Sequence, residues 1–257
     1  MKKIKISIIG GGNVATHLAR VFSKQPAVVL KQMYNRNINA LKEFKTTTEI
    51  IDDLSLLQPV DLTIIAITDD AIKDFSKKLN HLTHLVVHTA GSVSMNDLQV
   101  KRKGVFYPFQ TFSKVKKEID FSQIPILIEA QNKEDLQLLQ QLASLLSNRV
   151  LSVDFQQRKS LHIAGIIVSN FVNHLYVQAG ELLKQHDLSF DLLKPLIMEV
   201  AQKVQKIPPA KAQTGPALRG DIKIIRSHLD FIKDKELLKI YKLMSDSIIS
   251  FSKKQKS

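Results

Sequence analysis

The segment IKISIIGGGNVATHLARVF, residues 4–22, determines how the rest of the sequence is interpreted. A short apolar run, Ile4–Ile9, ends in three glycines, and apolar side chains then recur at helical spacing over Val14–Phe22. The glycines match the pattern G-x-G-x-x-G/A, with Ala15 in the last place. In this pattern the first glycine allows a tight turn, the second lets the backbone approach a pyrophosphate, and the small third residue lets the helix pack on the sheet. The segment therefore predicts a strand, a turn and a helix that bind a dinucleotide.

The start of the predicted helix is the expected phosphate site. Its free N–H groups and its dipole favour an anion. The residues predicted to hold the pyrophosphate are Gly10, Gly11, Gly12, Asn13 and Val14.

The end of the second predicted strand, Val28–Tyr34, indicates which dinucleotide is bound. NAD-binding proteins of this type carry an acidic residue here, which binds the ribose 2′-hydroxyl. This sequence has Asn35 and Arg36 instead, and an arginine pairs well with a 2′-phosphate. We therefore expect Asn35 and Arg36 to contact NADP, with NAD the less favoured cofactor.

Two further strands should bring polar residues to the same edge of a parallel sheet. The apolar runs Asp61–Ile67 and Leu85–His88 both read as buried strands. Ligands bind beyond the carboxyl ends of such strands, so Thr68, His88 and Thr89 are further predicted cofactor contacts. For His88 the alternative is a polar strand end without a ligand.

The whole sequence predicts an α/β fold, with an N-terminal Rossmann-like, mostly parallel sheet followed by an all-helical C-terminal domain. Strand signals continue to Val150–Val153 and stop near Phe155. We therefore predict a NAD(P)-binding domain over 1–154 and a helical domain for substrate binding or dimerisation over 155–257. The helices predicted in that second domain are Gln156–Lys184, Phe190–Lys206 and Asp234–Lys253.

The first of these helices carries candidate catalytic residues. Arg158, His162 and Asn170 recur on one helical stripe among apolar residues, which is typical of the lining of a cleft. A histidine suits proton donation near neutral pH, so His162 is the predicted acid. Asn170 is predicted to orient the substrate or cofactor, and Arg158 to bind substrate. The alternative is a half-buried helix whose polar groups are satisfied by their neighbours.

A polar turn, TGPALRGD at residues 214–221, is the second candidate for substrate contacts. Thr214 is predicted to donate a hydrogen bond to substrate, and Arg219 to clamp a carboxylate as a catalytic residue. Asp221 is expected to cap the helix that follows.

Composition limits the other functions. Cysteine is absent, and the eight histidines show no ligand spacing, so we expect no metal site. The net charge of +13 is spread along the chain rather than concentrated in a block, which argues against nucleic acid. We find no run of 18 apolar residues. We therefore expect a cytoplasmic protein that binds no membrane.

The combined motifs resemble a known family of Rossmann-like oxidoreductases that carry a C-terminal helical domain of unknown function. This family is distantly similar to pyrroline-5-carboxylate reductase, 6-phosphogluconate dehydrogenase and ketopantoate reductase. The resemblance implies the fold, the NADP cofactor and a homodimer formed by the long helices. The matching segments are IGGGNVATHLA (9–19), ITDDAI (67–72), VVHTAGS (86–92), YPFQTF (107–112), RKSLHIAGIIVSN (158–170) and TGPALRGD (214–221).

One position departs from the family pattern. The family commonly carries a histidine before the proline of the P-x-Q-T-F segment, where this sequence has Tyr107. A role in proton transfer does not carry over to Tyr107, but its hydroxyl can still donate a hydrogen bond to substrate.

Two functions follow from these observations. The first is an NADP-dependent oxidoreductase that transfers a hydride between NADPH and a small carbonyl or imine substrate bearing a carboxylate. The alternative is a dinucleotide-binding protein without catalytic activity, such as a redox sensor or an assembly partner.

Overall fold

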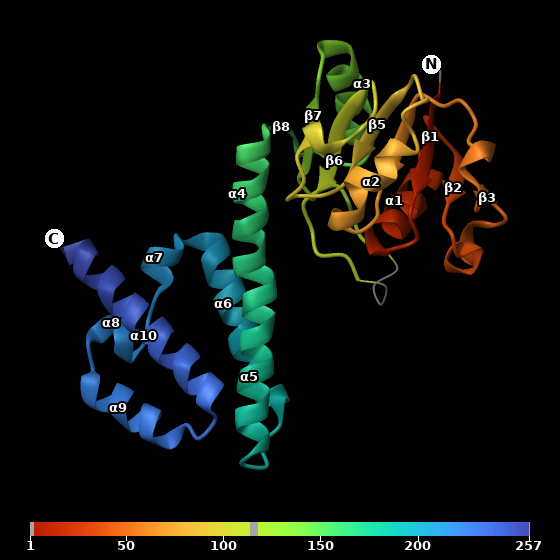
Figure 1. Ribbon diagram of the computed structural model, residues 1–257. Helices are drawn as coiled ribbons and strands as arrows, with labels where there is room; N and C mark the ends of the chain where they lie inside the picture. Colours follow the sequence, from red (N-terminus) through yellow and green to blue (C-terminus); the bar gives the residue numbers. More distant parts are fainter. Residues whose placement is uncertain (1–2, 114–117, 257) are drawn as a thin grey trace. The chain divides into compact units, whose positions relative to one another are not determined.

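The structure, a computed structural model, describes residues 3–113 and 118–256 (Figure 1). The chain divides into two compact units, Met1–Asn170 and Phe171–Ser257. Secondary structure changes from mixed to helical near the predicted boundary at residue 154, but the compact units divide later. The reason is that the first helix after the sheet packs on the first unit, where Gly165 lies directly against the ring of Phe109.

The first unit is built on one eight-stranded sheet in the order β3-β2-β1-β4-β5-β6-β7-β8. All neighbouring strands are parallel except β6 and β7, so the predicted mostly parallel sheet is confirmed. The strands are β1 (Ile4–Ile9), β2 (Val28–Tyr34), β3 (Glu49–Ile51), β4 (Leu62–Ile65), β5 (Leu85–His88), β6 (Lys103–Pro108), β7 (Ile126–Ala130) and β8 (Val150–Ser152). The strands β3 and β6 were not predicted from the sequence.

Helices cover both faces of this sheet. Alternate residues of a strand point to opposite sides, so each buried strand contributes apolar side chains to both faces. Ile8 of β1 belongs to the apolar cluster that α1 and α3 complete, whereas Ile9 belongs to the cluster that includes Ile72 of α2. The helices are α1 (Asn13–Ser23), α2 (Ile72–Lys77) and α3 (Lys133–Ser144), with short 3-10 turns over Ile38–Phe44, Leu54–Leu56, Asp69–Ala71 and Met95–Asp97.

The predicted long helix forms as α4 (Phe155–Ile166), a π-helical segment (Ile167–Phe171) and α5 (Val172–Lys184). Asp154 begins α4 with a reciprocal cap, because its side chain accepts from the Gln157 N–H while the Gln157 side chain accepts from the Asp154 N–H. By length and composition the helix Phe155–Lys184 is able to cross a membrane, because an 18-residue window within it has a mean hydropathy of 1.2. Core helices of proteins outside membranes pass the same test.

The second unit consists of helices throughout its described residues. They are α5 (Val172–Lys184), α6 (Lys194–Lys206), α7 (Pro209–Ala212), α8 (Pro216–Arg219), α9 (Ile222–Phe231) and α10 (Lys235–Lys256), with a 3-10 turn over Phe190–Leu193. Gly220 ends α8 in the left-handed conformation, at φ 77°. Large apolar side chains of this unit remain exposed, for example Leu192 at 64% and Leu196 at 60%.

Candidate functional site

A first cavity of about 750 Å³ lies at the carboxyl ends of β1 and β4, where the strand order of the sheet reverses. Open α/β sheets bind their ligands at such a point. Of the ten predicted cofactor contacts, all but His88 line it, namely Gly10, Gly11, Gly12, Asn13, Val14, Asn35, Arg36, Thr68 and Thr89. The structure therefore brings these residues together as one site.

The glycine turn has the shape that a pyrophosphate needs. Gly10 has a φ of 127°, and a Cβ on it would lie 2.2 Å from the carbonyl oxygen of Ala66. A Cβ on Gly12 would meet no atom within 4 Å, so the space in front of this residue is open to a ligand. The first turn of α1 carries no acidic residue, which leaves its N–H groups free to bind an anion. These residues fit a bound dinucleotide.

The turn after β2 presents the groups expected at the adenosine end. Arg36 is exposed and lines the cavity, and the side-chain amide of Asn35 covers Gly11, where a Cβ would lie 2.2 Å from Asn35 Nδ2. Lys78 also lines the cavity, within 5.9 Å of the Phe75 ring. The sequence analysis did not single out this second cation, because it lies after a helix and in no motif.

The structure contradicts the prediction that His88 contacts the cofactor. Its side chain is fully buried, and its Nδ1 accepts a hydrogen bond from the Ala90 N–H at 3.1 Å. Burial, reinforced by the nearby charge of Arg158, lowers the pKa of His88 to about 3. His88 is therefore a neutral interior residue that shapes the turn after β5.

The prediction that Arg158 binds substrate is also wrong. The guanidinium is fully buried, forms an ion pair with Glu129 of β7, and donates a hydrogen bond to the Val93 carbonyl oxygen at 2.7 Å. It also lies over the ring of Phe155 at 5.5 Å. Because these partners fill its surroundings, Arg158 is not open to a ligand. Its positive charge pairs with Glu129 inside the first unit.

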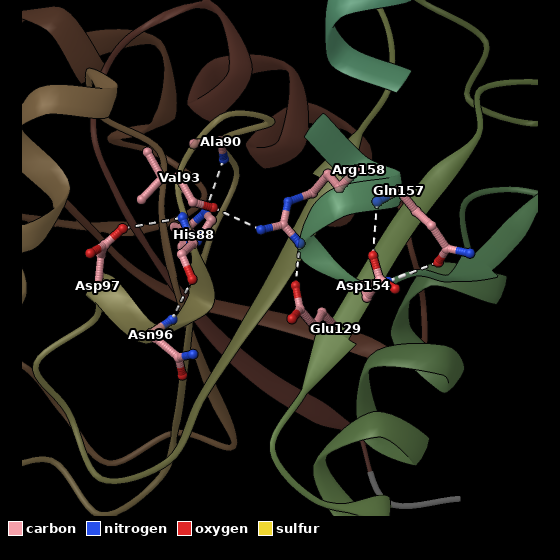
Figure 2. A network of polar contacts seen from close by, with 10 residues as sticks. His88, Ala90, Val93, Asn96, Asp97, Glu129, Asp154, Gln157 and Arg158 are labelled. Atoms are coloured by element: carbon pink, nitrogen blue, oxygen red, sulfur yellow. Dashed lines mark hydrogen bonds and ion pairs between the residues drawn. The ribbon is translucent and has the colours of Figure 1, made fainter. Parts of the chain in front are cut away.

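Figure 2 shows what this network holds in place. The segment after β5 is fixed by the Ala90–His88 hydrogen bond, by the Val93–Arg158 hydrogen bond, and by the Ser94–Asp97 capping box. Arg158 therefore joins this segment to the first turn of α4, one turn before His162. The buried pair fixes the position of the predicted acid relative to the segment that begins with Thr89.

A second cavity of about 400 Å³ brings three of the predicted site residues together. Tyr107 at the end of β6 and His162 on α4 share a hydrogen bond of 3.0 Å between the hydroxyl and Nδ1. Asn170, in the π-helical segment, lines the same cavity. The remaining lining residues are Phe109, Gln110, Thr111, Phe112, Gly165, Ile166, Val168 and Ser169.

The Tyr107 hydroxyl stays protonated over the physiological range. Burial, together with the negative charge of Asp69, raises the pKa of Tyr107 to about 12. Asp69 in turn contacts the hydroxyl of Ser92 at a short distance, and it lines the first cavity. The hydroxyl of Tyr107 is thus available as a hydrogen-bond donor.

The segment after β5 lies between the two cavities and contacts residues of both. Thr89 lines the first cavity. Two residues later, Gly91 lies so close to His162 that a Cβ on it would be 2.5 Å from Nδ1. His162 lines the second cavity, so a short backbone segment separates the two sites.

The polar turn of the second unit lines neither cavity. Arg219 is exposed, and its Nε donates to Asp221 at 2.9 Å. Asp221 holds the cap position of α9, but its side chain makes no capping hydrogen bond, so the expected cap is wrong. The substrate roles of Thr214 and Arg219 remain predictions.

Sequence reasoning missed most of the second cavity. The segment YPFQTF, residues 107–112, stood out in the sequence, but only Tyr107 received a role. Phe109, Gln110, Thr111 and Phe112 line the cavity as well. Their position on the family motif is the signal that would have found them.

Comparison with known proteins places these features in a family. Residues 124–248 match the family described as "Domain of unknown function (DUF2520)". The protein described as "putative NADP oxidoreductase BF3122" from Bacteroides fragilis is 41% identical, with 96% of this chain and 98% of that chain covered and a TM-score of 0.88. No curated protein matches the chain.

More distant structures share the fold. Pyrroline carboxylate reductase from Plasmodium falciparum, solved with NADP bound, is 11% identical, with 98% of this chain and 99% of that chain covered and a TM-score of 0.61. Imine reductase from Pseudomonas sp. is 14% identical, with 98% and 93% covered and a TM-score of 0.67. The fold and the extensive match with BF3122 confirm the resemblance noted in the sequence. The chain belongs to the family of Rossmann-like NADP oxidoreductases that includes BF3122 and carries a DUF2520 domain in its C-terminal part.

Proposed function

We propose that this protein binds NADPH in the first cavity and reduces a small carbonyl or imine compound in the second. The observation that carries the proposal is the Tyr107–His162 pair, which lines the second cavity and packs against Gly91, two residues after Thr89 of the first cavity. A proton donor in this pair would lie beside the end of the first cavity that is farthest along the sheet from Arg36. The names of BF3122, pyrroline carboxylate reductase and imine reductase support the same reaction type.

The residues divide the work of binding the cofactor. Gly10, Gly12 and the N-terminus of α1 would hold the pyrophosphate. Arg36 would pair with the 2′-phosphate. Thr68 and Thr89, which line the first cavity, would contact the nicotinamide end. When bound, NADPH supplies the hydride.

Tyr107 and His162 supply the proton that the reduction requires. As the hydride adds to carbon, the electron pair of the C=O or C=N bond moves to oxygen or nitrogen, which takes a proton from the Tyr107–His162 pair. The hydrogen bond between hydroxyl and Nδ1 lets the proton pass from His162 through Tyr107, or lets Tyr107 hold the imidazole while His162 donates directly. Asn170 would orient the substrate through its amide.

A carboxylate on the substrate would require a cation. Arg219 and Thr214 remain the predicted contacts for it.

The first test measures cofactor binding by calorimetric titration with NADPH and NADH. We expect tighter binding of NADPH, and an Arg36→Ala variant that loses about tenfold in NADPH affinity with little change for NADH, because only NADPH carries the 2′-phosphate. Arg226→Ala, an exposed arginine of α9 that lines neither cavity, is the matched control. A protein that prefers NADH, or an Arg36→Ala variant that binds NADPH like the wild type, would refute the assignment.

The second test measures turnover. NADPH oxidation is followed by absorbance with a panel of small 2-oxo acids and cyclic imines. Consumption that depends on one of these compounds is expected. NADPH binding without oxidation across the panel would instead favour the non-catalytic alternative, a dinucleotide-binding sensor or assembly protein.

We also propose that the protein acts as a homodimer formed through its helical part. The support is the exposed apolar surface of α4, the π-helical segment and the second unit, which monomers seldom leave open. Its most exposed members are Val168, Phe171, Leu192, Leu196, Met198 and Leu243. Light scattering in detergent-free buffer should give twice the mass of one chain. A monomer, or a protein that stays in solution only with detergent, would contradict this.

A further inference from the structure

The first turn of α1 contacts the wall of the second cavity as well as the cofactor cavity. Asn13 lines the first cavity, but its side-chain Nδ2 donates a hydrogen bond to the Phe112 carbonyl oxygen at 2.8 Å. Phe112 lines the second cavity. Asn13 is thus shared between the two sites.

His17, one helical turn later, strengthens the same connection. Its Nε2 makes a hydrogen bond of 2.9 Å with the Ser113 carbonyl oxygen, and its ring lies 5.3 Å from that of Phe112. The His17 side chain is buried, at 2% exposed. Asn13 and His17 lie four residues apart and therefore share a face of α1. This face of α1 contacts Phe112 and Ser113, the last two residues of the segment 109–113.

We propose that Asn13 is a positioning residue that couples cofactor binding to the formation of the substrate site. This inference rests on the proposed function of the two cavities. A pyrophosphate held by the N–H groups of the first turn restrains the backbone of Asn13, and through its side chain the carbonyl of Phe112. Part of the entropy cost of ordering the segment 109–113 is then met when NADPH binds, so the second cavity takes its ligand more readily afterwards. By linkage, a ligand in the second cavity tightens NADPH binding by the same factor.

The inference predicts an order of binding. NADPH enters first and the carbonyl or imine substrate second, because bound NADPH restrains the segment 109–113 before the substrate arrives. Removal of the Asn13 side chain leaves the backbone N–H groups of the phosphate site unchanged.

Hydrogen exchange with NADPH as the only added ligand tests this directly. In the wild type, NADPH should slow exchange in two peptides, the glycine turn at 10–14 and the cavity wall at 109–113, the second by roughly fivefold or more. In Asn13→Ala the protection of 10–14 should remain, while that of 109–113 is lost. Thr16→Val is the matched control, because the Thr16 hydroxyl bonds to the carbonyls of Gly12 and Asn13 within the same turn.

A second variant guards against a folding defect in the first. His17→Phe keeps a ring against Phe112 but removes the hydrogen bond to Ser113, so it should reduce the protection of 109–113 in part. Protection of 10–14 alone in the wild type, or full protection of both peptides in Asn13→Ala, would overturn the coupling and leave the proposed function standing. Absence of protection at 10–14 in the wild type would instead mean that NADPH does not bind, and both proposals would fall.

Discussion

The two cavities of the first unit are built from different parts of the chain. The first is mainly a backbone structure, in which a glycine turn and the start of a helix face open space. The second is made of side chains from two segments far apart in the sequence, and its central contact joins Tyr107 to His162. A backbone site depends on a local conformation, whereas a side-chain site depends on the packing of the entire unit. Substitutions in the first cavity should therefore have different effects on stability, NADPH affinity and turnover from substitutions in the second.

The largest difference in stability is expected between two substitutions in the glycine turn, at Gly10 and at Gly12. Gly10→Ala places a Cβ on the Ala66 carbonyl oxygen at a positive φ, and should lower the free energy of unfolding by roughly 5 kcal/mol. Gly12→Ala meets no protein atom, so it should keep the wild-type stability but lose NADPH affinity, because the new methyl group occupies the space for the pyrophosphate. Urea denaturation and calorimetric titration measure the two effects. Equal stability of the two variants would contradict this account of the turn.

The next largest effect is expected in the network between the cavities. Arg158→Met leaves the carboxylate of Glu129 and the Val93 carbonyl without their cationic partner, and should cost about 3–5 kcal/mol of unfolding free energy. A double variant, Arg158→Met with Glu129→Leu, should regain most of this loss, because no charge then remains buried. Urea denaturation of the wild type, the single variant and the double variant measures the three unfolding free energies. A single variant within 1 kcal/mol of the wild type would show that the pair is as weak as an exposed one.

The same network predicts a loss of stability in acid. The pKa of His88 is about 3 in the folded protein and near its ordinary value of 6.5 when unfolded. As the pH falls from 6.5 towards 3, the unfolded chain binds a proton that the folded protein does not, so stability decreases, by roughly 4 kcal/mol over this range. His88→Asn keeps an acceptor for the Ala90 N–H and should remove this dependence. Unfolding free energies that fall equally with pH in both proteins would refute the role of His88.

A smaller, purely catalytic effect is expected in the second cavity. Tyr107→Phe removes the hydroxyl that bonds to His162 and should lower kcat by about 100-fold, without changing NADPH affinity or stability by much. Tyr176→Phe on α5 is the matched control. Both are measured by NADPH absorbance with the substrate found in the panel. If NADPH affinity fell along with kcat, the Tyr107 hydroxyl would serve cofactor binding as well, and its assignment to the second cavity alone would be refuted.

The sequence predicted the backbone site well, because its determinants are local. The strands β1, β2 and β5 have the predicted bounds, since each is a short run rich in apolar residues that ends at a turn. The strand β6 was missed, because it begins with Lys103-Gly104 and ends in a proline, none of which favours a strand interior.

The side-chain sites were predicted less well, because a sequence does not show which polar residues find partners. His88 and Arg158 read as ligand contacts, yet both are interior groups. Glu129, which neutralises Arg158, is 29 residues away along the chain. The pairing of Tyr107 with His162 spans 55 residues, and it arises only when β6 and α4 pack in the same unit.

The π-helical segment Ile167–Phe171 gives the long helix a tolerance to the loss of one residue. Such a segment holds one residue more than a regular helical turn, and π turns of this kind occur often at functional sites. A π turn with its extra residue advances about as far around the helix axis as a regular α-helical turn without it, so deleting one residue would restore α-helical geometry with little change in the register of the residues that follow. The side chains within the segment would be displaced instead, and Val168, Ser169 and Asn170 line the second cavity. A single codon deletion here would therefore change the lining of the cavity while it preserves the helix.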